Sequence, residues 1–309
     1  MNAPVTLNAA PGDDATNGLA GPALGPAAFA RIARIAYREA GLAISEGKSA
    51  MVRTRLARRL RALGLTSYEA YCDRVESPEG RDEIGLMVSA LTTNVSAFFR
   101  ESHHFDILRT DVLPALVAKA KAGGRVRIWS AGCSNGQEPY SIAATLLEVG
   151  MPPDSDMRVL ATDIDPNVVA FARAGRYPET MVSGLPEAMR AKYFAALPGP
   201  GEPSWEAGPT LKAPVAFRVL NLLEPWPMRG KFDAIFCRNV VIYFDAETQD
   251  RLWTRFADQL APGGWLFLGH SERLSVGAKP LFEGRGITTY RKRDAASAGA
   301  PRDRLTGGS

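Results

Sequence analysis

The chain has 309 residues, of which 46% are hydrophobic and 23% charged, so it is long and apolar enough for one large domain and a smaller one. Its net charge of +4 is too small to indicate a nucleic-acid binder. No apolar run reaches membrane-spanning length and no signal-peptide pattern is seen at the start, so we expect a cytoplasmic protein without membrane insertion. The three cysteines and three histidines lack CxxC or zinc-site spacing, so we expect neither disulfides nor a metal.

The N-terminal part of the chain predicts a disordered tail followed by a small helical domain. Residues 1–26 are rich in Ala, Pro, Gly and Asn and hold little that could pack, which is typical of disorder. Across 27–109, apolar side chains recur at three- and four-residue spacing without a strand pattern, which indicates a helical domain and a linker. In MVRTRLARRLRALG, this spacing gives an amphipathic helix whose basic face carries Arg55, Arg58 and Arg59.

This basic face has two interpretations. Charges on one side of a helix are usually just solvated. Alternatively, the face attracts a partner, and a region rich in glutamates fits better than nucleic acid or anionic lipid because the total charge of the chain is modest.

From residue 110 to 293 the chain alternates apolar runs with helical segments, which predicts an α/β domain with a mostly parallel sheet covered on both faces. The runs that read as strands are RVRIWSAG, MRVLATDID, AFRVLNL, FDAIFCRNVVIYF, GWLFLGHSE and GITTYRKR. A Pro- and Gly-rich stretch within about 180–216 breaks this rhythm without a clear three-strand pattern, and we expect a small subdomain inserted there. Residues 294–309 resemble the first tail and predict a second one.

Polar residues follow four of the predicted strands. A turn with Gly132 and Gly136 comes after the first strand, Asp163 after the second, Asn221 after the third and Asn239 after the fourth. Ligands of open parallel sheets bind beyond the carboxyl ends of the strands, so we expect these residues to surround one ligand. Glycines let the backbone approach it closely, and a carboxylate can accept hydrogen bonds from both hydroxyls of a ribose.

Each of these residues also has a simpler explanation. The glycine turn could be a tight connection without a ligand, and asparagine is common in turns. Asp163 could cap the next helix, but Asp165, directly before Pro166, is better placed for that role. The turn lacks the Lys-Ser/Thr of a P-loop and the third glycine of a dinucleotide fingerprint, so a cofactor with ribose and adenine but no pyrophosphate, such as S-adenosylmethionine, fits it best.

The same turn, GCSNG, also spells the G-x-S-x-G pattern of a serine hydrolase. In that alternative, Ser134 is the nucleophile, His270 the base and Asp233 or Asp245 the acid. It is the weaker hypothesis, because the nucleophile elbow normally follows several strands and here follows one, and because no segment for an oxyanion hole is visible.

Five stretches in the same order resemble the CheR chemotaxis methyltransferases, and the resemblance runs from about Phe29 to Arg293. The stretches are SALTTNVSAFFRESHHF, WSAGCSNGQEPYSIA, ATDIDPNVVAFARAGRY, FDAIFCRNVVIYFD and GGWLFLGHSE. The resemblance implies a class I, Rossmann-like methyltransferase sheet with a small N-terminal helical domain and a small β excursion inserted in the catalytic domain. It implies methyl transfer from S-adenosylmethionine to glutamates of chemoreceptors, with S-adenosylhomocysteine as product.

The resemblance also implies a set of site residues. Glu138 would reach the amino group of the methionine moiety, although an acid in the first turn of a helix is also stabilised by the helix dipole. Arg55, Arg58 and Arg59 would contact the cytoplasmic, glutamate-bearing region of the receptor, and the protein is expected to be a monomer. The residues implied to line the cofactor site, beside Gly132, are Asn94, Ser96, Arg100, Glu138, Asp163, Asn221, Leu222, Asn239 and Val240.

The proposed chemistry needs few catalytic groups. A glutamate carboxylate is ionised at neutral pH, so it needs no general base to act as a nucleophile. Arg100 offers a bidentate fork that could hold this carboxylate, and Tyr243 offers a hydroxyl. Arg100 could instead form a surface ion pair with Glu101, and Tyr243 could be a core aromatic. A methyltransferase with another acceptor also remains open.

Overall fold

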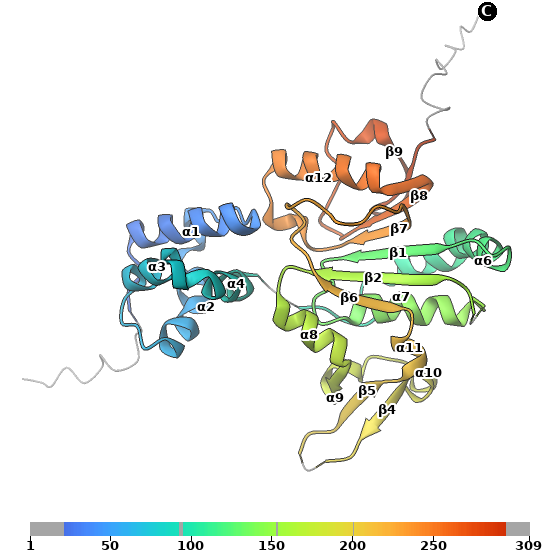
Figure 1. The fold of residues 1–309 in the computed structure, drawn as a ribbon, viewed down its shortest axis with the longest axis horizontal. Helices are drawn as coiled ribbons and strands as arrows, with labels where there is room; N and C mark the ends of the chain where they lie inside the picture. Colours follow the sequence, from blue (N-terminus) through green and yellow to red (C-terminus); the bar gives the residue numbers. More distant parts are fainter. Residues whose placement is uncertain (1–21, 93–94, 153, 200, 295–309) are drawn as a thin grey trace, which may run out of the picture.

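The computed structural model describes residues 22–92, 95–152, 154–199 and 201–294 (Figure 1). Most of the two predicted tails therefore lies outside the described residues. Of the first tail, the structure describes residues 22–26, and the first helix already begins at Pro26. Of the second tail, it describes Asp294.

The N-terminal part of the described chain is helical, as predicted, and lies beside the sheet in Figure 1. Apolar side chains at helical spacing, such as Ile32, Val52 and Tyr71, are fully buried between the helices. Ser67 caps the third helix by accepting the N–H of Ala70 at 3.1 Å. The helices are α1 (Pro26–Ala40), α2 (Ser49–Ala62), α3 (Tyr68–Glu76) and α4 (Arg81–Leu91), with 3₁₀ turns at Glu46–Lys48 and Pro78–Gly80.

A second helical stretch leads into the sheet domain. It consists of α5 (His103–Ile107), a π-helical turn (Leu108–Val112) and α6 (Leu113–Lys121). Phe105 and Leu108 are buried in the same cluster as side chains of the sheet, so this stretch packs on the sheet and not on α1–α4. In the structure, the boundary between the helical part and the sheet part thus lies before residue 103, whereas the sequence placed this boundary near residue 109.

The described residues form a seven-stranded sheet in the order β6-β2-β1-β7-β8-β10-β9. All pairings are parallel except those of β10, which runs antiparallel to β8 and β9. The six predicted strands are present, but the fourth ends at Cys237 and the later part of its apolar run forms a 3₁₀ turn (Val241–Tyr243), and β9 was not predicted. The strands are β1 (Val126–Ala131), β2 (Met157–Asp163), β6 (Val215–Val219), β7 (Phe232–Cys237), β8 (Leu260–Leu268), β9 (Phe282–Gly286) and β10 (Thr289–Lys292).

Alternate side chains of the central strands build two apolar layers, one on each face of the sheet. In β1, Trp129 packs with Trp253 of α12, whereas Ile128 packs with Leu116 of α6 and Ile142 of α7. Because successive residues point to opposite faces, both faces are buried, as predicted for a parallel sheet. The remaining helices of the sheet domain are α7 (Gln137–Glu148), α8 (Pro166–Ala174) and α12 (Ala246–Gln259).

The strand order reverses between β1 and β7. From β1 the chain continues outward through β2 to β6, and it then returns to β7 on the other side of β1 (Figure 1). This reversal leaves a crevice beyond the carboxyl ends of β1 and β7, which is where open α/β sheets bind their ligands.

The inserted subdomain contains a three-stranded antiparallel sheet in the order β3-β5-β4, which confirms the small β excursion that the resemblance implied, although the sequence shows no clear three-strand pattern there. Its strands are three or four residues long and half exposed, too short for alternation to be recognised in the sequence. Residue 215, which the sequence placed in this subdomain, begins β6 of the main sheet. The elements are β3 (Arg176–Pro178), α9 (Glu179–Val182), α10 (Glu187–Tyr193), β4 (Phe194–Leu197), β5 (Ser204–Ala207) and α11 (Pro209–Lys212).

A candidate cofactor site at the switch point of the sheet

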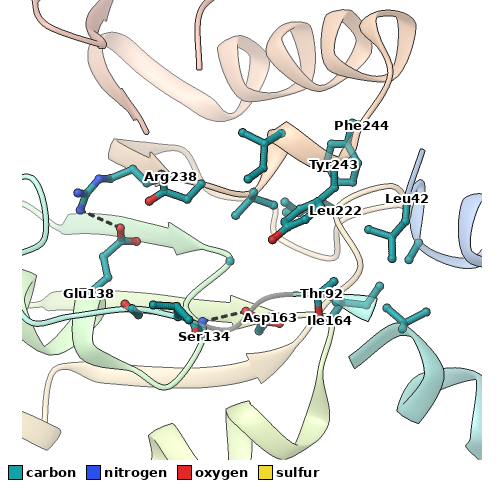
Figure 2. Close-up of a pocket in the computed structure, with 18 of the residues that line it drawn as sticks. Leu42, Thr92, Ser134, Glu138, Asp163, Ile164, Leu222, Arg238, Tyr243 and Phe244 are labelled. Atoms are coloured by element: carbon teal, nitrogen blue, oxygen red, sulfur yellow. Dashed lines mark hydrogen bonds and ion pairs between the residues drawn. The ribbon is translucent and has the colours of Figure 1, made fainter. Parts of the chain in front are cut away.

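A cavity of about 370 Å³ lies at the carboxyl ends of β1, β2 and β7. Its walls come from both parts of the protein, because Leu42 and Thr92 of the helical part face the ends of the sheet strands (Figure 2). Every predicted cofactor residue that the structure describes lines this cavity, while Asn94 lies outside the described residues. These lining residues are Ser96, Arg100, Gly132, Glu138, Asp163, Asn221, Leu222, Asn239 and Val240.

The turn after β1 requires its glycine. Gly132 has a φ of 95°, which L side chains rarely adopt, and a Cβ added there would lie 2.2 Å from Cγ2 of Val240. Because Val240 follows β7, the close approach of β1 and β7 at the switch point excludes any larger residue. The turn then passes through Ser134, whose φ of 47° is also left-handed.

Asp163 holds this turn from the end of β2. One of its carboxylate oxygens accepts the N–H of Ser134 at 2.8 Å, and the other accepts the N–H of Asp165 at 3.1 Å (Figure 2). Asp165 itself caps α8 by accepting the N–H of Asn167 at 2.8 Å, as the sequence predicted. Burial raises the pKa of Asp163 above its ordinary value. Each carboxylate oxygen has a second lone pair, so both can still accept a hydrogen bond from a ligand.

Glu138 is a buried carboxylate at the start of α7. Ser130 donates to one of its oxygens at 2.6 Å, and Nη1 of Arg238 lies 3.2 Å from the other (Figure 2). Burial raises the pKa of Glu138, and the neighbouring guanidinium opposes this shift. Glu138 lies in the first turn of a helix and also lines the cavity, so its position is compatible with both interpretations, and its contact with a cofactor stays a prediction.

Arg238 is a functional residue that the sequence reasoning missed. Its guanidinium is buried, lies 3.2–3.3 Å from the carboxylates of Glu138 and Glu101, and also donates to the carbonyl of Arg100. Burial disfavours the charged form of Glu101, but Arg238 and His270 outweigh it and lower the pKa of Glu101 to about 2. The signal in the sequence was a lone charge inside the apolar run FDAIFCRNVVIYF, which predicts a buried, paired arginine.

Glu272 was also missed, although it lies in one of the recognised motifs. Its buried carboxylate accepts the N–H groups of Gly269, Asn239 and Val241 at 2.7–2.9 Å. It therefore fixes the loop after β7, in which Asn239 has a left-handed φ of 61°. Glu272 and Asp163 thus play the same structural role, because each carboxylate accepts backbone N–H groups and holds a loop at the cavity.

Arg100 and Tyr243 both line the cavity. The guanidinium of Arg100 donates to the carbonyl of Val95 at 3.0 Å, and the alternative ion pair with Glu101 is not formed because Glu101 pairs with Arg238 and His270. Tyr243 packs against the core of the helical part, so its aromatic ring also has a structural role.

Asn221 joins the two parts of the protein. Its side-chain nitrogen donates to the carbonyl of Glu39 at 2.9 Å, and its oxygen accepts the N–H of Leu223 at 3.0 Å. Each end of the amide thus makes one hydrogen bond within the protein and keeps a second donor or acceptor position. Two further links are the hydrogen bond from the hydroxyl of Tyr37 to Asp245 at 2.6 Å and that from the N–H of Ala43 to the carbonyl of Tyr243.

The predicted basic face of α2 is only partly exposed. Arg59 makes two hydrogen bonds to the buried carboxylate of Glu83, at 2.9 and 2.6 Å, and Arg55 donates to the carbonyl of Leu91. Of the three predicted arginines, Arg58 is the exposed one. Arg55 and Arg59 thus contact α4 and are only partly exposed, and the contact of these arginines with a receptor stays a prediction.

The residues of the alternative hydrolase triad are not brought together. Ser134 lines the cavity, but a ring nitrogen of His270 contacts Glu101 at 3.1 Å. Asp233 pairs with Lys119 and with the N–H of Arg127, at the opposite end of the sheet. Asp245 caps α12. No acid–base–nucleophile chain connects these groups within the described part of the chain.

A doubly wound sheet with a glycine turn, an acidic residue after β2 and a cavity at the switch point defines a Rossmann-like methyltransferase domain. The CheR methyltransferase SAM-binding domain matches residues 94–291, and the CheR all-alpha domain matches residues 27–92. The chain belongs to the CheR methyltransferase family, which confirms both the predicted fold class and the resemblance.

Relatives of this chain carry consistent names. A probable chemotaxis protein methyltransferase of Rhizobium etli is 49% identical over 82% of this chain and 96% of its own. The chemotaxis protein methyltransferase of Escherichia coli is 41% identical over 87% of this chain and 91% of its own. Chemotaxis protein methyltransferase 2 of Pseudomonas aeruginosa is 41% identical over 85% of this chain and 91% of its own. Among the described helices, none is long and apolar enough to cross a membrane.

Proposed function

We propose that this protein transfers the methyl group of S-adenosylmethionine to glutamate side chains of chemoreceptors, giving glutamate methyl esters and S-adenosylhomocysteine. The observation that carries this proposal is the meeting of Gly132, Glu138 and Asp163 at one cavity in a chain of the CheR family. Two buried carboxylates with raised pKa values suit a ligand that brings positive charge and hydroxyl donors.

The residues of the cavity fit the cofactor. Asp163 retains one lone pair on each oxygen for the two ribose hydroxyls, and Glu138 offers a carboxylate to the amino group of the methionine moiety. The missing Cβ of Gly132 keeps the backbone beside Val240 open to close approach. Bound there, S-adenosylmethionine supplies an electrophilic methyl group.

The protein then has to orient an acceptor carboxylate. Arg100 lines the cavity and makes no ion pair with any described residue, so its guanidinium is available to hold this carboxylate in line with the methyl group. Two opposite charges disappear as the ester forms, so a site that excludes water favours the reaction. The helical part, which closes one side of the cavity, contributes to this exclusion.

The proposal is tested by incubating the protein with methyl-labelled S-adenosylmethionine and membranes that carry chemoreceptors. We expect label on the receptor bands that is released by mild base, as for a carboxyl methyl ester. Base-stable label would contradict the ester. Tight cofactor binding without any transfer would show that the acceptor is another molecule.

Replacing Ser134 with alanine separates the proposal from the hydrolase alternative. Ser134 contacts Asp163 through its backbone N–H, which alanine retains, so we expect methyl transfer to stay within about tenfold of the unaltered protein, the cost of a strained left-handed residue. The initial rate of receptor labelling measures this effect. Complete loss of activity would indicate that the hydroxyl takes part in the chemistry.

Arg58 is the exposed one of the three arginines of α2 that are predicted to contact the receptor. Exchanging it for glutamate reverses an exposed charge, so we expect receptor methylation at subsaturating receptor to slow by about tenfold at low salt, with unchanged cofactor affinity. Arg251, an exposed arginine of α12, provides the matched control, and Arg251→Glu should leave the rate unchanged. Equal rates for both variants would mean that the Arg58 side chain is merely solvated.

A further inference from the structure

Three potential metal ligands meet beside the cofactor cavity at the start of α5. Glu101, His103 and His104 each place one ligand atom within 4.8 Å of the others. Three atoms of these side chains, Oε2 of Glu101, Nε2 of His103 and Nδ1 of His104, are buried without a hydrogen-bond partner among the described residues, although Oε2 lies 3.3 Å from the guanidinium of Arg238. Buried polar atoms are almost always paired, so the two ring nitrogens require an explanation.

The hydrogen bonds of His104 determine which of its nitrogens can bind an ion. Its Nε2 lies 3.2 Å from the carbonyl oxygen of Ile287, which can only accept, and 3.0 Å from the hydroxyl oxygen of Thr288, which can accept or donate. In the neutral tautomer that donates its N–H to Ile287, Nδ1 has a lone pair and faces Oε2 of Glu101 at 3.5 Å. This is the tautomer that a metal ion at Nδ1 would require. An imidazole that donates one N–H to a backbone carbonyl is the usual arrangement of a histidine metal ligand.

The separation of these two atoms fits an ion better than a water molecule. Around a tetrahedral zinc ion with bonds of about 2.1 Å, neighbouring ligand atoms lie about 3.4 Å apart. Around a water molecule with hydrogen bonds of about 2.8 Å, the corresponding distance is about 4.6 Å. The observed 3.5 Å between Nδ1 of His104 and Oε2 of Glu101 matches the shorter value.

We propose that Glu101, His103 and His104 form a binding site for a divalent transition-metal ion, with zinc as the best match. Two imidazoles and one carboxylate are a common ligand set for zinc, and such three-ligand sites keep a fourth position for water. The ring of His103 lies 4.1 Å from that of His104, centre to centre, so a small rotation of this partly exposed side chain completes the set.

The neighbouring residues orient one ligand of this site and also reduce the affinity that we expect for the ion. The other oxygen of Glu101 accepts the backbone N–H of His270 at 3.2 Å, which orients Oε2 toward the two histidines. Arg238 lies 3.3 Å from Oε2, and its positive charge weakens ion binding, so we expect lower affinity than in a four-ligand structural site. The earlier expectation of no metal relied on spacing in the sequence, which does not detect a site made of adjacent histidines and a carboxylate.

The site has a structural consequence for the cofactor cavity. Glu101 directly follows Arg100, which lines the cavity, and the ion would join this segment to the N-terminus of α5. The proposal does not depend on the identity of the methyl acceptor, since it concerns ligand atoms outside the set that lines the cavity.

The test titrates Co²⁺, and then Zn²⁺ as competitor, into chelator-treated full-length protein. We expect one equivalent of Co²⁺ to bind with a visible absorption band that zinc abolishes. In His103→Ala the affinity should fall by at least about tenfold, as expected when a metal site loses a contributing side chain. Asp106 is an exposed carboxylate of the same helix that pairs with Arg109, and Asp106→Asn serves as the matched control with an unchanged band.

Three outcomes would overturn the site: no stoichiometric Co²⁺ binding, an unchanged affinity in His103→Ala, or loss of the band in Asp106→Asn with His103→Ala unaffected. Because His103 is partly exposed, its variant should remain folded, and circular dichroism verifies this. None of these outcomes depends on methyl transfer, so failure of the metal site and failure of the proposed function are distinguished.

Discussion

Replacing Arg238 with methionine is expected to lower the free energy of unfolding by about 3–5 kcal/mol, because the change leaves two buried carboxylates without their cation. Glu101 and Glu138 both lie 3.2–3.3 Å from this guanidinium, whose side chain is 2% exposed. Methionine fills a similar volume, so the loss reflects charge rather than a cavity. Urea unfolding of the two proteins at neutral pH measures the difference.

The pH dependence of the same variant provides an internal check. Without Arg238, the pKa values of Glu101 and Glu138 rise, so the folded variant takes up protons at a higher pH than the unaltered protein. The stability difference should therefore shrink as the pH falls from neutral toward acid. Arg251→Met, which removes an exposed pair with Glu247, should cost about 0.3–0.5 kcal/mol at most. Equal losses for both variants would contradict a buried charge cluster.

Replacing Arg100 with alanine is expected to reduce kcat for receptor methylation by about 100-fold, the usual effect of removing a donor that holds the reacting group. The same change should affect stability little, because Arg100 donates one side-chain hydrogen bond, to the carbonyl of Val95. Initial rates at saturating cofactor and receptor measure kcat, and calorimetry measures the affinity for S-adenosylhomocysteine.

The comparison of Arg100→Ala with Arg100→Lys separates orientation from charge. Lysine retains the positive charge but lacks the planar fork, so we expect it to recover only part of the lost rate. Full activity of Arg100→Lys would argue for a purely electrostatic role. A loss of cofactor affinity as large as the loss of rate would place Arg100 in cofactor binding and not in alignment of the acceptor.

Much of the fold was predictable because its pattern is local. Buried parallel strands are continuous apolar runs, and the helices between them have a clear apolar face, so the sheet domain followed from the sequence. The strands β3, β4 and β5 of the small sheet have three or four residues each and were not found. β9 was missed for a similar reason, since most of its residues are exposed and include two glycines.

The site was predictable where its residues lie at strand ends or in recognised motifs. Gly132, Asp163 and Glu138 belong to this group. The lone charge of Arg238 in an apolar run indicates a buried pair, but its partners lie 100 or more residues away in the chain, so no local pattern identifies them. On α2, helical spacing correctly placed Arg59 on a polar face but could not show that Glu83 already binds it.

The cavity has walls from two separately packed cores, and this has a consequence for ligand exchange. The helical part is held to the sheet part by contacts such as Tyr37 with Asp245 and Asn221 with Glu39. A molecule bound in the cavity contacts both cores, so we expect side chains that hold the cores together to influence the residence time of the product. The turnover rate is therefore expected to depend in part on the strength of the contacts between the two cores.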